Sequence, residues 1–244
     1  MYDLTDFSLH DMTQCGAELR NCTVNASTME SAARMLVQYL HNNLVSSSKP
    51  EKACALVRFF RTVKFGDLNP ECQKFARSLL KDRSESPEIK CLTLLATTGI
   101  LPEWNDRKLS RGHQTIPLHG VEVIEQAPMI SQLLSQLGVD IAAIVKPNGL
   151  PMLDPARTSF NVFFVSTAKG SPWIPAQQEF IIPFKIESVL GFGGALADGD
   201  LFVIILFSKV PISRSVADMF KTIALNAKLA LLPFSGSRIF DEPQ

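Results

Sequence analysis

The last third of the chain places the strongest constraint on the fold. Two apolar segments, residues 186–196 and 201–210, are separated by the sequence Ala-Asp-Gly-Asp. An Asp-Gly pair supplies the positive backbone angles that a tight hairpin needs. Residues 213–232 then repeat apolar side chains with a helical period and end before Pro233. This part of the sequence predicts two antiparallel strands followed by a long amphipathic helix.

The helix predicted over residues 213–232 has two apolar surfaces. At about 100° per residue, one broad arc is apolar enough to cover a sheet face. Leu225 and Leu229 lie one turn apart among charged residues on the other side. Because full burial of one leucine stabilises a fold by about 1.5–3 kcal/mol, we expect both to be covered. The cover is either the N-terminal helix of the same chain or a partner chain.

Residues 3–22 predict a helix with a narrow apolar seam. Its apolar residues recur at steps of three and four, which is the spacing of a coiled-coil seam. Such a seam suits pairing with one other helix better than covering a sheet. The predicted dimer interface therefore consists of Met12, Cys15, Leu19, Leu225 and Leu229.

Local signals predict the remaining helices and strands. Ser27 and Glu30 have the spacing of a capping box, which predicts a helix start. Asn69 before Pro70 predicts a second start, because the missing N–H of proline costs nothing at the first helical position. Apolar runs predict strands over residues 53–60, 91–97 and 160–165, and a short helix over 128–137.

Charge and composition exclude several classes of protein. The 24 basic residues balance 24 acidic ones, so the chain lacks the basic surface that nucleic-acid binding normally requires. The five cysteines are irregularly spaced, which argues against a disulfide framework or a zinc site. The N-terminus has acids where an export signal carries positive charge, and no apolar run approaches the ~20 residues of a membrane span. We expect a cytoplasmic protein that binds neither nucleic acid nor membrane.

Residues 99–157 are the most irregular part of the sequence and predict a long, functional loop region. Trp104, Arg107, Arg111 and His113 could hold an anionic or aromatic ligand there, because guanidinium groups pair with carboxylates and tryptophan stacks. A solvated loop is the alternative. With residues from the neighbouring segments, the predicted ligand-binding set is Cys91, Trp104, Arg111, His113, Asn161 and Trp173.

Other chemistry finds little support in the sequence. The glycines of the Gly-Phe-Gly-Gly run at residues 191–194 precede a strand rather than a helix, so close backbone approach is favoured over a phosphate loop. A metal or haem site built from Cys91, His113 and His119 is a minor alternative to ordinary solvated histidines, and no metal site is predicted. No Gly-x-Ser-x-Gly motif occurs. We expect no enzyme activity.

The predicted order of elements resembles a GAF domain, a sensory module of bacterial signalling proteins. The resemblance rests on Glu-Ser-Val-Leu-Gly-Phe-Gly-Gly-Ala-Leu at residues 187–196, the Asp-Gly turn, the apolar strand 201–208 and the helix 213–232. It implies an α+β fold, with an antiparallel sheet of five or six strands and helices on its faces. It also implies a sensory domain over residues 27–232, preceded by a helix within 1–26 for dimerisation and followed by a tail, 233–244.

The resemblance implies a function in signal transduction. Such domains bind a small molecule between the sheet and the variable region, dimerise through terminal helices, or do both. They also precede sensor histidine kinases of two-component systems and cyclases, which are therefore the expected partners of a homodimer. The markers of bilin-binding and cyclic-nucleotide-binding members are absent from this sequence, so the cofactor or ligand stays open. Two alternatives are an interaction module without a ligand, and a methionine sulfoxide reductase that uses Cys54 and Cys91.

Overall fold

The computed structural model describes residues 1–46, 51–80, 85–110, 112–120, 124, 128–136, 162–236 and 238–241. A six-stranded sheet in the order β6-β5-β4-β9-β8-β7 forms its centre. All neighbouring strands are antiparallel. The strands are β4 (Cys54–Lys64), β5 (Lys90–Gly99), β6 (Thr115–Pro117), β7 (Val162–Val165), β8 (Ser188–Ala195) and β9 (Leu201–Ser208). The predicted α+β fold is therefore confirmed.

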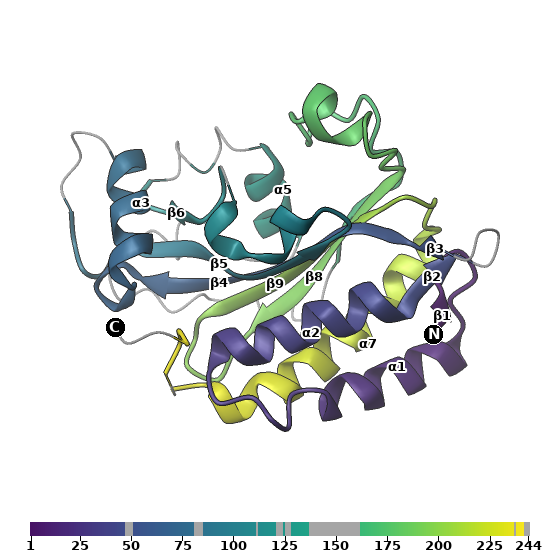
Figure 1. Ribbon diagram of the computed structural model, residues 1–244, viewed down its shortest axis with the longest axis horizontal. Coiled ribbons are helices and arrows are strands. Elements are labelled where there is room, and N and C mark those ends of the chain that lie inside the picture. The colour runs from purple at the N-terminus through teal and green to yellow at the C-terminus, as the bar shows by residue number, and fades with distance from the viewer. Residues whose placement is uncertain are drawn as a thin grey trace.

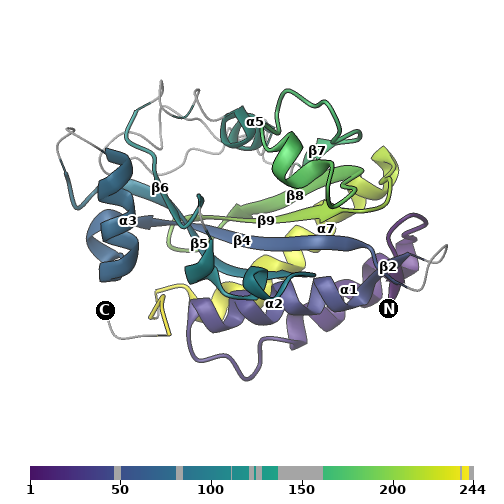
Figure 2. The same ribbon diagram turned by 45° about the horizontal axis from the view of Figure 1, so that its top comes forward.

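Three helices cover one face of the sheet and a short helix lies over the other. Helices α1 (Leu9–Asn21), α2 (Met29–Asn43) and α7 (Arg214–Leu231) lie together on the first face, as Figures 1 and 2 show. Helix α5 (Pro128–Gln136) lies on the second face. Helix α3 (Pro70–Leu80) packs at the end of the sheet beside β6. The smaller elements are a second sheet of β1 (Tyr2–Asp3), β2 (Leu44–Ser46) and β3 (Glu51–Lys52), and short 3-10 or π turns at Phe65–Asp67, Pro102–Asn105, Arg107–Leu109, Gln177–Ile181 and Leu232–Phe234.

The predicted hairpin and the helix behind it are confirmed. Strands β8 and β9 pair from Ser188↔Ser208 to Ala195↔Leu201. Gly199 in the turn has φ +82°, a left-handed angle that glycine adopts without strain. Gly191 and Gly193 lie within β8, so the glycine run serves close packing in the sheet rather than a phosphate loop.

Both faces of the central strand β4 are buried, and its alternate side chains belong to two separate cores. Val57 and Phe59 join the core beneath α1, α2 and α7. Leu56 and Phe60 join the core on the opposite face. We call that opposite face, which carries α5 and irregular segments, the loop face. The alternation follows from the two-residue period of a strand.

The N-terminal segment packs into the main core. Helix α1 begins at Leu9, capped by Ser8, because residues 2–3 form a strand with β2. Cys15 and Leu19 are fully buried in the core shared with α7. Gly16 lies so close to α7 that an added Cβ would stand 2.6 Å from Asn226 Nδ2.

The start of α2 differs from the sequence prediction by one residue. Thr28 and Ser31, rather than Ser27 and Glu30, form the capping box. The carboxylate of Glu30 is engaged elsewhere: its Oε1 accepts a 2.6 Å hydrogen bond from Arg107 Nε. Both side chains of this ion pair are about nine-tenths buried or more.

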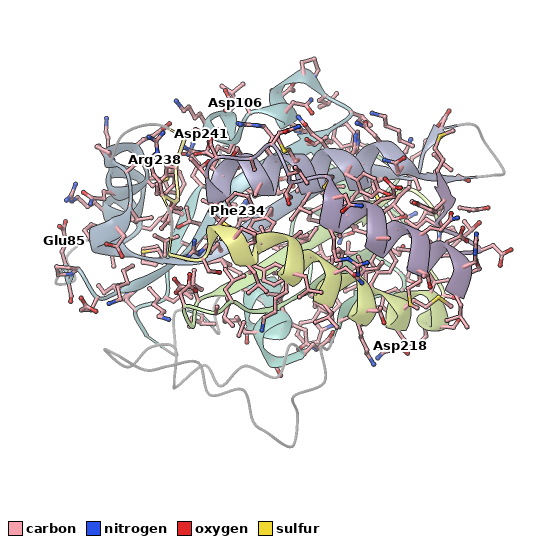
Figure 3. All side chains as sticks on the ribbon, turned by 90° about the horizontal axis from the view of Figure 1, so that it is seen from below. Glu85, Asp106, Asp218, Phe234, Arg238 and Asp241 are labelled. Atoms are coloured by element: carbon pink, nitrogen blue, oxygen red, sulfur yellow. The ribbon has the colours of Figure 1, made fainter. Side chains whose placement is uncertain are left out.

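The C-terminal segment also contacts the start of α2. The amides of Met29 and Glu30 donate to the carbonyls of Arg238 and Ile239, and the Asp241 amide donates to Glu30 Oε2 at 3.0 Å. Figure 3 shows Asp106, Arg238 and Asp241 gathered near one end of α2. Residues 238–241 are therefore hydrogen-bonded to the start of α2.

We predict that the buried ion pair contributes strongly to stability. Glu30→Ala leaves Arg107 buried without its carboxylate, and such a loss costs about 3–5 kcal/mol. Glu85→Ala is the matched control, because its ion pair with Arg77 is half-exposed and is worth about 1 kcal/mol or less. Urea unfolding midpoints measure both effects. If both substitutions lower the urea midpoint by the same small amount, the buried Glu30–Arg107 pair contributes no more to stability than an exposed pair, and the prediction is wrong.

Stability should fall in mild acid because of His41. Burial, assisted by the charges of Lys52 and Lys209, lowers the pKa of His41 from 6.5 to about 4. Lys52 Nζ lies 3.3 Å from His41 Nδ1, and an ammonium can only donate, so this nitrogen accepts. Between pH 6.5 and about 4 the unfolded state binds more protons, so stability decreases as pH falls.

The free energy of unfolding, measured by urea titration across that window, checks this expectation. His41→Gln should flatten the pH dependence, whereas His10→Gln, which removes an exposed histidine, should leave its slope unchanged. A His41→Gln variant with the wild-type slope would contradict the assignment.

Candidate functional site

The loop face, which is mainly apolar in the described residues, carries a basic side chain. Arg58 lies on β4 between Leu56 and Phe60, which both belong to the loop-face core. The alternation of the strand therefore places Arg58 on that same face. Its Nε atom is completely buried and has no hydrogen-bond partner within the described residues.

The pKa of Arg58 reflects this isolation. Burial lowers the pKa of its guanidinium to about 10, and burial is the only cause of that shift. Within the described residues, Arg58 forms no ion pair of 4.0 Å or less with an acid. A buried charge without a partner carries a desolvation cost of several kcal/mol, so an anion placed beside Arg58 would reduce that cost.

Aromatic residues lie immediately beside Arg58. Its partner across the sheet on β5 is Thr97, whose Oγ1 donates a 3.0 Å hydrogen bond to the carbonyl of Trp104. The Trp104 ring contacts Phe184 and Phe180 edge-on at 4.6 and 5.4 Å between centroids. Phe180 in turn meets Phe207, which pairs with Leu56 one step along the same face. We call Trp104, Phe180, Phe184 and Phe207 the aromatic cluster.

A small cavity lies on the other side of Arg58, between the sheet and α5. Its volume is about 20 Å³, and its walls come from β4, β5, β9 and α5. His113 closes one side of the cavity. His113 is exposed on its outer side; desolvation against the sheet, and then the charge of Arg58, lower its pKa. The lining residues are Phe60, Leu92, His113, Ile116, Met129, Ile130, Leu133, Val203 and Ile205.

The structure brings together only part of the predicted ligand-binding set. Trp104 and His113 lie on the loop face. Cys91 lies on the opposite face, in the core beneath the helices. Trp173 stands apart, 41% exposed, in an open depression of about 310 Å³ formed with the end of β7. Arg111 and Asn161 lie outside the described residues.

The structure also contradicts the expectation that Arg107 could hold a ligand. The sequence places it among basic residues that could hold a ligand, but its guanidinium is buried against Glu30 and lies over the Phe240 ring, 5.4 Å from the centroid. It therefore serves the fold. Among the described residues, an arginine that does lie on the loop face is Arg58, within the strand predicted over residues 53–60.

Sequence reasoning could have found Arg58 from one signal. The segment Ala-Cys-Ala-Leu-Val-Arg-Phe-Phe, residues 53–60, is otherwise entirely apolar. A permanent charge inside such a strand requires either a partner or a function, because arginine is almost never fully buried unpaired. Which of the two applies depends on its neighbours in space, and these come from β5, β9 and residues 102–113.

The two cysteines of the reductase alternative do not form a reactive pair in this structure. Burial raises the pKa of both Cys54 and Cys91 to about 12, so their thiols are protonated at neutral pH. Cys91 pairs with Val63, nine residues along β4 from Cys54. At 3.3 Å per residue this separates the two thiols by roughly 30 Å.

The predicted dimer residues divide into two groups. Cys15 and Leu19 are buried within the chain, and Met12 packs partly against the same core. Helix α1 thus lies against α7, yet it leaves Leu225 and Leu229 of α7 42% and 43% exposed. These two leucines are the part of the predicted interface that remains available to a partner.

Two general features of the described residues complete the description. No group of three or more His, Cys, Asp or Glu side chains in this part of the chain could hold a metal ion. Among the helices within the same residues, none is long and apolar enough to cross a membrane.

No protein-family model matches the chain, and no curated protein matches it by sequence. Similar solved structures include the GAF domain of a phosphoenolpyruvate-protein phosphotransferase from Acinetobacter, with 10% identity, TM-score 0.45, and coverage of 94% of this chain and 97% of that one. The phycocyanobilin-bound GAF domain of a cyanobacterial phytochrome has 9% identity, TM-score 0.45, and coverages of 91% and 94%. An N-acylhomoserine lactone-dependent LuxR-family transcription factor from Burkholderia cenocepacia has 11% identity, TM-score 0.41, and coverages of 93% and 99%.

We predict that Arg58→Met stabilises the ligand-free protein. The substitution removes an unpaired buried charge and keeps a long apolar side chain, so the free energy of unfolding should rise by about 1–2 kcal/mol. Arg61→Met on the same strand is the matched control. Its side chain is more deeply buried than that of Arg58, and its Nη2 bonds Asp198 and Asp200 at 2.7 and 3.3 Å, so its loss should cost about 3–5 kcal/mol.

Urea unfolding of the purified variants, after exhaustive dialysis, measures both changes. If both substitutions destabilise the protein equally, Arg58 has a partner in solution and the interpretation of an uncompensated charge is wrong.

Proposed function

We propose that this protein is a sensory or regulatory module of signal transduction, which binds a small ligand on the loop face of its sheet. The observation that carries the proposal is the buried Nε of Arg58, which lacks a partner among the described residues. Stable cores do not retain such a charge without a role, because its desolvation cost opposes folding. A ligand that supplies the missing acceptor removes this cost, and its binding then stabilises the folded protein.

The loop face is also better suited to admit a ligand than the helix-covered face. Opposite the three long helices, the described cover consists of the nine-residue α5 and irregular segments. The cavity of about 20 Å³ beneath α5 holds no more than about one water molecule. A ligand would therefore enlarge it by moving α5, a displacement that can report binding.

A route for output starts at the aromatic cluster. Trp104 and Arg107 are three residues apart, in consecutive short 3-10 turns after β5. Trp104 faces the proposed ligand site, whereas Arg107 bonds Glu30 at the start of α2. Because Glu30 also accepts from the Asp241 amide, a shift of this segment would reach α2 and the C-terminal residues together. We propose a histidine kinase or cyclase as the recipient, and the cytoplasm as the location.

Mass spectrometry and absorbance of the gently purified full chain test the proposed function. A small molecule bound in stoichiometric amount, and lost on denaturation, is the expected result. The interaction-module alternative predicts no such molecule and no compound that shifts the melting temperature. The reductase alternative predicts methionine sulfoxide reduction that is lost in a Cys54→Ser, Cys91→Ser variant. Retained reduction in that variant would exclude these cysteines.

Dimerisation through α7 is the second part of the proposal. Leu225 and Leu229 form an apolar stripe that α1 does not cover, and burial of each in a dimer would contribute about 1 kcal/mol or more. We expect the wild type to have the mass of two chains by light scattering, and Leu225→Glu with Leu229→Glu to have the mass of one.

Leu79→Glu with Ile182→Glu is the control for that measurement. These residues are 43% and 44% exposed, which matches the two α7 leucines, but they lie on other elements. If the α7 variant remains a dimer, or if the control variant dissociates equally, then Leu225 and Leu229 do not form the dimer interface.

A further inference from the structure

The charges around Arg58 also restrict the chemical class of the ligand. This inference rests on the proposed function and names what the site would bind. Within the described residues, Arg58 is the one permanently charged group whose pKa is shifted by burial with no acid among the causes. For His113 the causes are burial and Arg58, and both favour its neutral form. The site therefore offers one permanent positive charge, that of Arg58.

We propose that the ligand is a monocarboxylate with an apolar body. A single negative charge compensates Arg58, whereas a dianion such as a phosphate monoester would leave one charge buried and unpaired, which is costly. A carboxylate is planar and matches two adjacent N–H groups of a guanidinium. The Nε–H of Arg58, which has no acceptor among the described residues, would be one of these two donors.

The surroundings of Arg58 define the body of the ligand. On one side lies the aromatic cluster, tied to the partner of Arg58 through the bond from Thr97 to Trp104. On the other side lie Phe60 and Ile205 in the wall of the cavity. Both sides are apolar, so a neutral aromatic or short aliphatic body would be stabilised there, and a further polar group would lose its hydration without compensation.

The test uses paired compounds on the intact chain. The probes are 3-phenylpropionate and hexanoate, the corresponding primary amides as uncharged analogues of the same shape, and phenyl phosphate as a dianion. Thermal unfolding is recorded at increasing concentrations. We expect the carboxylates to raise the melting temperature by about 3–6 °C at ten times their Kd. The amides and phenyl phosphate should give no comparable shift.

Two variants decide whether Arg58 is responsible. Arg58→Met should abolish the shift, although the variant itself folds, and Arg58→Lys should weaken it because one amine cannot form the paired bonds. Arg214→Met, which removes an exposed arginine on α7, should keep the full shift.

The outcomes separate the two proposals. Equal shifts with acids and amides, retained in Arg58→Met, would overturn the monocarboxylate assignment while leaving a ligand-binding module in place. A shift with phenyl phosphate alone would also overturn it. If the carboxylates give no shift up to their solubility limits, the assignment is wrong, and the proposed function then depends on the co-purified ligand alone.

Discussion

Burial of strand β4 on both faces is the constraint on which the rest of the structure depends. It pairs with β5 on one side and β9 on the other, and its alternate residues supply two cores. Such a strand tolerates a charge only where the surrounding structure supplies a counter-charge. Arg61 meets this condition through Asp198 and Asp200. Arg58, three residues earlier and on the other face, does not.

Three arginines near the core differ in their partners, and this difference distinguishes a structural role from the proposed ligand-binding role. Arg107 and Arg61 are buried with carboxylates at 2.6–3.3 Å, so each completes a network and holds elements together. Arg58 is less buried overall, and its buried Nε has no such bond in the described chain. Nε and Nη1 of Arg61 are also unbonded there, but its Nη2 reaches two carboxylates. The number of arginines in and around the core therefore says little. The partners of each one decide what it does.

Much of the fold could be predicted from the sequence, because its signals are local. The Asp-Gly turn, the cap at Ser213 and the Asn69-Pro70 helix start depend on residues within one turn, and each is found in the structure. The site was less predictable. Trp104 and His113 were identified from their region, but the roles of Arg58 and Arg107 depend on Thr97, Glu30 and Phe240, which are distant in sequence. No local pattern distinguishes a paired arginine from an unpaired one.

The most direct measurement of the central claim is the NMR signal of the Arg58 side-chain Nε–H group, assigned by its loss in Arg58→Lys. The account predicts a slowly exchanging signal in the free protein, because the group is buried, at a position typical of an Nε–H without an acceptor. Addition of 3-phenylpropionate should move it strongly, while the Arg61 signal stays in place. A signal that exchanges rapidly with water, or one that the carboxylate leaves unchanged, would contradict the claim.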